Sequence, residues 1–109
     1  VFYNGYMATR ELLGAIERAG TTNNIAVIKQ LEGLKMSAAD RMQTYDAYIN
    51  PNTHQVQQTI YLATANSAPV DENDMFEILT ESPPDAVRDT SADTACKLES
   101  YEDTPSFDA

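Results

Sequence analysis

Residues 46–63 read DAYINPNTHQVQQTIYLA, and this stretch decides how the chain is expected to fold. Asn50-Pro51-Asn52 is strong turn chemistry, and the flanking residues 43–49 and 54–63 are rich in Tyr, Thr, Val and Ile. The pattern therefore predicts a β-hairpin. Its second strand begins with polar residues, but residues 60–63 are almost all apolar, so we expect this half to be buried on both faces.

Two amphipathic helices are predicted before the hairpin. Residues 5–19 place apolar side chains at helical spacing, with Asn4 as a plausible N-cap and Gly20 closing the helix. Residues 24–32 repeat the pattern and end at Gly33, and residues 35–41 are partly charged and predict no regular structure. Because the connecting turn is so short, the two helices must lie side by side or meet at a sharp angle.

Regular patterning weakens beyond residue 66. Residues 74–79 (DMFEIL) predict a short strand or helical turn, whereas residues 85–109 are acidic, aperiodic and rich in Ser, Thr and Asp. We expect this last segment to be a strap that is pinned at intervals. The candidate anchors are Leu98, Tyr101 and Phe107.

The acidic residues are concentrated in this second part of the chain. Residues 1–66 carry five acidic and five basic side chains, whereas residues 67–109 carry twelve acidic and two basic ones, so the whole net charge of −10 lies there. An acidic extension on a neutral body is typical of a solvated strap. No basic stripe is available to neutralise phosphates, and this argues against nucleic acid as a partner.

The predicted order of helix, helix, hairpin and strap does not make a complete domain. A hairpin of two strands, one of which is apolar in its second half, needs further strands to pair with. The chain also opens VFYN without Met. We therefore expect a piece of a longer polypeptide. In this interpretation residues 1–66 are the helix–helix–hairpin part of an α/β lobe, and residues 67–109 are an acidic extension that packs on another lobe or is partly disordered.

Few residues suggest chemistry. His54 sits beside a turn and is expected to be exposed, Cys96 lies in the least regular stretch, and Asp40 and Asp46 suit a solvated turn better than a carboxylate pair. No spacing of ligands or glycines indicates a metal or phosphate site. The sequence therefore predicts no enzyme, no cofactor and no metal. The single cysteine, Cys96, is either an inert thiol or half of a disulfide whose partner lies elsewhere.

Aromatic side chains crowd the start of the first helix. Phe2, Tyr3 and Tyr6 surround a helix N-terminus, whose free N–H groups and partial positive charge suit a carboxylate. These aromatic residues either wall an apolar ligand group or pack as core and hydrophobic staple.

Three stretches resemble one known family. The run YNGYMATRELLGAIERAGTTNNIAVIKQLEGL (residues 3–34) is similar to the late two-helix segment of type I periplasmic solute-binding proteins. DRMQTYDAYINPNTHQVQQTIYLA resembles that family's hairpin and lobe-crossing strand, and CKLESYEDTPSF resembles the tail of a branched-chain amino acid or amide importer subgroup.

The resemblance implies an α/β, bilobed fold of which this chain supplies two helices, a β-hairpin with a lobe-crossing strand, and an extended acidic C-terminal strap. Phe2, Tyr3 and Val1, at the start of the first helix, would then border the ligand cleft. The implied partners are a small solute such as an amino acid or amide, the membrane permease of an ABC importer, and the remainder of the same polypeptide. The implied location is the periplasm, reached through a signal peptide that these residues do not include. A ligand-sensing domain of the same fold in a receptor or regulator is the alternative.

Overall fold

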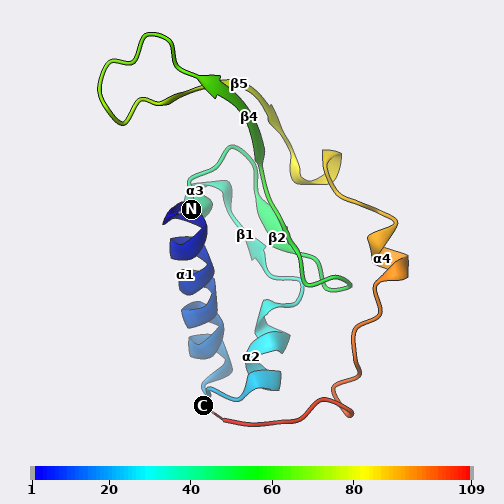
Figure 1. Ribbon diagram of the computed structural model, residues 1–109. Coiled ribbons are helices and arrows are strands. Elements are labelled where there is room, and N and C mark those ends of the chain that lie inside the picture. Colours follow the sequence, from blue (N-terminus) through cyan, green and yellow to red (C-terminus); the bar gives the residue numbers. More distant parts are fainter. Residues whose placement is uncertain (1, 109) are drawn as a thin grey trace.

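The computed structural model describes residues 2–108 and shows a mixed α/β arrangement with two small antiparallel sheets (Figure 1). This confirms the predicted α/β class at its coarsest level. The elements are α1 (Phe2–Ala19), α2 (Asn24–Leu31), β1 (Lys35–Met36), α3 (Ala38–Arg41), β2 (Ala47–Ile49), β3 (Val56–Gln57), β4 (Ile60–Ala65), β5 (Phe76–Ser82), the 3-10 helix η1 (Pro84–Ala86) and α4 (Ala92–Ala95).

The two predicted helices form, with one corrected boundary. Helix α1 begins at Phe2, so Asn4 lies inside it and is not its N-cap. This first turn is held by the Tyr3 side chain, which bonds to α3. The ends follow the sequence as predicted, because Gly20 and Gly33 adopt left-handed φ angles of 65° and 70°. The Asn23 side chain caps α2 by accepting the Ala26 N–H at 3.1 Å.

The predicted hairpin forms, but it is short. Strands β2 and β3 pair Tyr48 with Gln57 and Ile49 with Val56, and β1 pairs with the other edge of β2. The segment 35–41, for which the sequence predicts no regular structure, therefore contains β1 and the short helix α3. Strands β1 and β2 contribute Met36, Ala47 and Ile49 to a small core, and Leu31 and Leu34 pack against it.

The second strand divides in two, and the burial predicted for residues 60–63 is wrong. After the buried Thr59, the chain continues as β4, which pairs only with β5 among the described residues (Figure 1). Every residue of β4 is exposed. The hairpin projects from the body, so no other layer formed by residues 2–108 covers its faces (Figure 1). Strand β5 settles the expectation for residues 74–79 in favour of a strand.

The strap runs back along the body from β5 through η1 and α4 and ends beside α2 (Figure 1). Hydrogen bonds with Asn24 attach the C-terminal residues of the strap to α2. The Asn24 N–H donates to the Phe107 carbonyl oxygen at 3.1 Å. Of the three predicted anchors, Tyr101 is the one that is half-buried, whereas Leu98 and the Phe107 ring are exposed. Polar groups therefore hold the strap more than apolar ones do.

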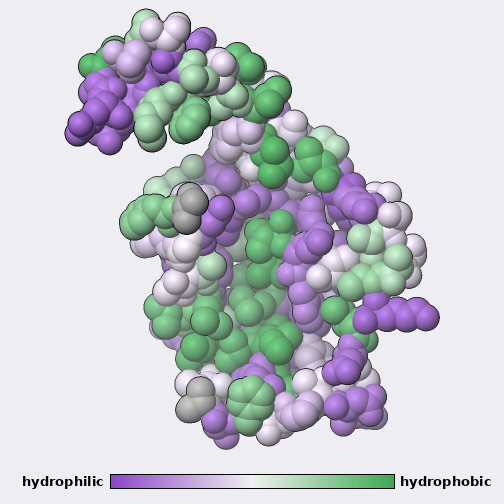
Figure 2. Space-filling view, viewed as in Figure 1, coloured by the Kyte–Doolittle hydropathy of each residue, from purple (hydrophilic) through white to green (hydrophobic). Residues whose placement is uncertain are grey.

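The molecule is elongated. Its radius of gyration is 17.0 Å and its extents are 55 × 31 × 20 Å, whereas a compact domain of this length has a radius of about 13 Å. Hydrophobic side chains gather on the face shown in Figure 2, between α1 and the strap. Within residues 2–108, no helix is long and apolar enough to cross a bilayer.

Candidate functional site

The predicted cleft residues at the start of α1 have different surroundings. The Phe2 side chain is 87% exposed and stacks on Tyr6, with ring centroids 6.4 Å apart. Tyr3 instead packs inward, where its hydroxyl donates a 2.6 Å hydrogen bond to the Arg41 carbonyl oxygen. Val1 lies outside the described residues. A role for these residues as a cleft wall stays a prediction. The residue that Tyr3 contacts is Arg41.

Arg41 is a buried cation at the end of α3. The left-handed conformation of Met42, with φ of 52°, ends this helix and turns the chain. The Arg41 side chain is only 5% exposed. Its guanidinium carbon lies 5.8 Å from the centroid of the Tyr3 ring, which is within the range of a cation–π contact.

The polar partners of the Arg41 guanidinium are few. Nη2 donates to the Gln58 side-chain oxygen, and Nη1 lies 3.6 Å from the Met36 sulfur and 3.8 Å from Glu11 Oε1. The Nε atom is buried and has no hydrogen-bond partner among the described residues. A buried donor without an acceptor costs about 1–3 kcal/mol, and buried charges are normally paired and hydrogen-bonded. Arg41 is therefore ion-paired with Glu11 but keeps one buried donor, Nε, without an acceptor among the described residues.

A cavity of about 310 Å³ beside Arg41 lies between α1, α2 and strands β2 and β3. We call it the Arg41 trough. Its apolar wall is formed by Met7, Ala8, Leu12, Leu31, Ile49 and Val56. Its polar lining residues are Asn4, Glu11, Arg41 and Gln58. The trough thus combines an apolar wall with one buried cation, one carboxylate and two amides, which suits a small amphipathic ligand.

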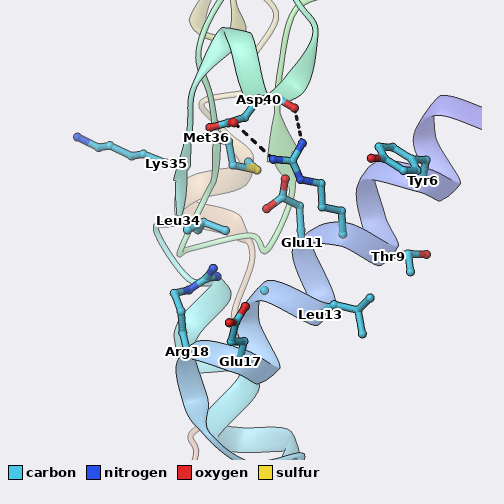
Figure 3. A pocket seen from close by; sticks show the side chains of 12 residues that line it. Tyr6, Thr9, Glu11, Leu13, Glu17, Arg18, Leu34, Lys35, Met36 and Asp40 are labelled. Atoms are coloured by element: carbon cyan, nitrogen blue, oxygen red, sulfur yellow. Dashed lines mark hydrogen bonds and ion pairs between the residues drawn. The ribbon is translucent and has the colours of Figure 1, made fainter.

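A larger groove of about 650 Å³ lies between α1 and the β1–α3 segment (Figure 3). Most of its charged side chains are exposed, and Arg10 and Asp40 compensate each other. The Arg10 guanidinium donates to the Asp40 carbonyl oxygen at 2.8 Å and lies 3.4 Å from its carboxylate, and in Figure 3 the Lys35 side chain extends away from the groove. The groove therefore offers no buried unsatisfied group, and we regard the Arg41 trough as the better candidate site.

Asp40 and Asp46 have structural roles, in agreement with the preferred interpretation of the sequence. The Ser37 hydroxyl donates to the Asp40 carboxylate at 2.7 Å, and this bond, with help from Arg10, lowers the pKa of Asp40 despite partial desolvation. Asp46 accepts the Ala38 N–H at 2.7 Å. Both carboxylates therefore cap or brace α3, the helix that presents Arg41.

His54 contacts Glu32, the C-cap of α2, and Cys96 lies in the strap. His54 is exposed, as predicted, and its Nε2 lies 2.8 Å from Glu32 Oε1. Cys96 is an exposed, free thiol at the end of α4. A disulfide to a cysteine elsewhere stays a prediction. No group of three or more His, Cys, Asp or Glu side chains within residues 2–108 is arranged to hold a metal ion.

No local sequence signal distinguishes Arg41. It stands in a charged segment, 35–41, for which no regular structure is expected, and only its long-range packing against Tyr3, Glu11 and Gln58 distinguishes it from a surface arginine. No family model, curated protein or solved structure matches the chain.

Proposed function

We propose that this chain is part of a type I periplasmic solute-binding protein that delivers its solute to the membrane permease of an ABC importer. The solute is a branched-chain amino acid, an amide or a related small organic acid, and it binds between two lobes that close on it. The chain catalyses no reaction in this proposal, because its role is to select the solute and to present the closed state.

The observation that carries the proposal is the uncovered β4–β5 hairpin. Residues opposite each other in its register share a face. One face therefore presents Tyr61, Ala63, Ala65, Phe76 and Ile78 beside Glu81, and the other presents Ile60 and Leu62 among the polar Thr64, Glu77 and Thr80. All of these side chains are exposed. A two-stranded ribbon of this kind is marginal alone in water. An exposed face that is mainly apolar is instead what a strand that crosses into a second lobe requires.

The elongated shape supports the same conclusion. The body exposes apolar residues along α1, including Leu12 at 46% and Leu13 at 61%. Burial of such a surface contributes about 25 cal/mol per Å², so a partner lobe that covers α1 and the hairpin would stabilise the whole assembly. That partner is the remainder of the same polypeptide.

A thermal unfolding assay on the complete polypeptide that contains these residues tests the proposal. A panel of aliphatic amino acids, amides and small organic acids should include at least one member that raises Tm, because a ligand at 100 times its Kd stabilises the folded state by about 2.7 kcal/mol. Sugars of similar size serve as the control panel. No shift with any amino acid, amide or acid would overturn the proposal.

A further inference from the structure

We infer that residues 83–96 of the strap form a releasable lid over the polar face of the three-stranded sheet, held shut by a charged latch centred on Asp93. The lid consists of η1, α4 and the residues between and beside them. It is a conformational device of this chain and needs no solute, so its test is independent of the proposed function.

The three-stranded sheet has one apolar face and one polar face. Its register places Lys35, Tyr48 and Gln57 opposite one another across β1, β2 and β3, and side chains in such positions share a face. Because successive side chains of a strand alternate between faces, the core residues Met36 and Ile49 lie on the other face. The polar face therefore needs a layer that can offer it hydrogen bonds.

The lid supplies this layer, but it packs loosely. A cavity of about 520 Å³ lies between the β1–β2 strands and the lid, where Pro84 and Asp85 form part of its wall. A second cavity of about 500 Å³ lies between β3 and the lid residues Val87 and Asp89. Pro84 is buried, whereas the Val87 side chain is 47% exposed. Apolar burial therefore contributes little to keeping the lid in place.

Five polar side chains attach the lid to the sheet instead, and we call them the latch. The Asn50 amide of the hairpin turn donates to Asp93 Oδ1 at 2.6 Å, while Arg88 donates to the other Asp93 oxygen. The Tyr48 hydroxyl donates to the Asp85 carboxylate at 2.8 Å and accepts from Arg88 Nη1 at 3.2 Å. Asp93 thus joins the body through one oxygen and the lid through the other.

The charge on Asp93 is the central element of the latch. Its side chain is only 14% exposed, and that of Arg88 is 30% exposed, so solvent screens this pair only in part. The bonds from Asn50 and Arg88 lower the pKa of Asp93, so its carboxylate remains charged in neutral solution. Hydrogen bonds to a charged group are stronger than those between neutral groups.

The backbone of the lid is attached only to itself. Among residues 2–108, no backbone hydrogen bond joins residues 83–96 to the sheet, and bonds such as that from the Cys96 N–H to the Ala92 carbonyl oxygen, at 2.8 Å, lie within the lid. Segments with few apolar contacts and no ladder to the core open locally at low cost. The lid should therefore open as one unit when the latch is lost.

Trypsin digestion of the complete polypeptide that contains these residues measures this opening. Trypsin binds an arginine side chain in its specificity pocket before cleavage, so the bond after Arg88 can be cut only when the guanidinium has left Asp93 and Tyr48. When opening is fast, the cleavage rate follows the population of the open form. Mass spectrometry identifies the products, and a free peptide of residues 83–96 serves as the reference rate.

Two variants remove parts of the latch while keeping Arg88. Asp93→Asn keeps an oxygen for Asn50 but loses the charge, and we expect cleavage after Arg88 to become at least about 10-fold faster. Tyr48→Phe should accelerate it about 3-fold to 10-fold. Asp103→Asn, with the same charge change outside the lid, and Tyr45→Phe are the matched controls and should stay within about twofold of the natural protein.

The natural protein gives a second measurement that needs no variant. Between ionic strengths of about 0.01 M and about 1 M the Debye length falls from about 30 Å to about 3 Å. The cleavage rate after Arg88, relative to the free peptide, should rise over this range because the Arg88–Asp93 attraction weakens. A relative rate that neither salt nor Asp93→Asn changes would overturn the inference, while solute binding would be untouched.

Discussion

The hydroxyl of Tyr3 donates a 2.6 Å hydrogen bond to the carbonyl oxygen of Arg41, 38 positions away in the sequence. The Tyr3 ring also lies 5.8 Å from the Arg41 guanidinium carbon. One side chain thus touches both the backbone and the charged group of the same residue. This contact fixes the first turn of α1 against the end of α3 and sets the position of the candidate site.

Tyr3→Phe removes the hydroxyl and keeps the ring. We expect the free energy of unfolding to fall by about 0.5–1.5 kcal/mol, the usual net contribution of one hydrogen bond. Urea denaturation followed by circular dichroism measures the change. Tyr6→Phe, on the same helix with its side chain half exposed, is the matched control and should differ from the natural protein by less than about 0.5 kcal/mol. Equal losses in the two variants would contradict the structural role of the Tyr3 hydroxyl.

Met7 is the second residue on which the packing of α1 depends. Its side chain is 1% exposed, whereas that of Met42 is 66% exposed. Met7→Ala should lower the free energy of unfolding by about 2–5 kcal/mol, because deletion of a buried side chain loses apolar burial and leaves a cavity. Met42→Ala should change it by no more than about 0.5 kcal/mol. The same denaturation assay compares the pair, and a loss at Met7 no larger than that at Met42 would place the Met7 side chain outside the core.

The elements that could be predicted from the sequence are those specified by local signals. Both long helices carry apolar periodicity and end at glycines, and the structure places Gly20 and Gly33 in the left-handed conformation that such ends require. The turn at Asn50 likewise leads into the pairing of β2 with β3. Caps, glycines and turn residues act within a few positions, so one sequence is sufficient to find them.

The features that the sequence did not predict depend on contacts between residues that are far apart in the sequence. An apolar run such as 60–63 shows that a strand seeks burial but not whether a covering layer exists, and β4 lies exposed against β5 alone. Arg41 was missed for the same reason, because its burial depends on α1 and Gln58, both far away in sequence. Of the two described residues of the predicted site, Tyr3 lies among the groups around Arg41, whereas Phe2 faces solvent.

The end of the strap depends on Asn24. Its side-chain oxygen accepts the Phe107 N–H at 2.9 Å, and its side-chain nitrogen donates to the Pro105 carbonyl oxygen at 2.9 Å. Asn24→Ala removes both side-chain bonds but keeps the backbone N–H bond of residue 24 to Phe107 and the Asn23 bond to Ser106. It should therefore loosen the last residues of the strap while the helices remain folded. Hydrogen exchange read by mass spectrometry should show faster exchange in residues 97–108 only. Asn73→Ala, in the β4–β5 loop, is the control. Unchanged protection of the strap in Asn24→Ala would contradict this anchoring role.

Tyr101 fastens the middle of the strap and makes its attachment sensitive to high pH. The Lys29 Nζ lies 4.8 Å from the centroid of its ring. Burial, together with the nearby Glu32 carboxylate, raises the pKa of Tyr101 to about 12. Burial alone would raise the pKa of Glu32, but the nearby Tyr101 hydroxyl and the His54 ring outweigh it and lower that pKa.

The sign of the pH effect follows from the direction of the Tyr101 shift. Because the folded state favours the neutral phenol, its contribution to stability is fully present below the unfolded pKa of about 10 and is lost as the pH rises through about 12. Ultraviolet titration of phenolate absorbance should show a component near pH 12 that Tyr101→Phe removes and that unfolding in guanidinium shifts to about 10. Glu32→Gln should move this component downward only in part, because burial remains the larger cause. A titration of the folded protein that Tyr101→Phe leaves unaltered above pH 11 would show that the Tyr101 phenol is not held against Glu32.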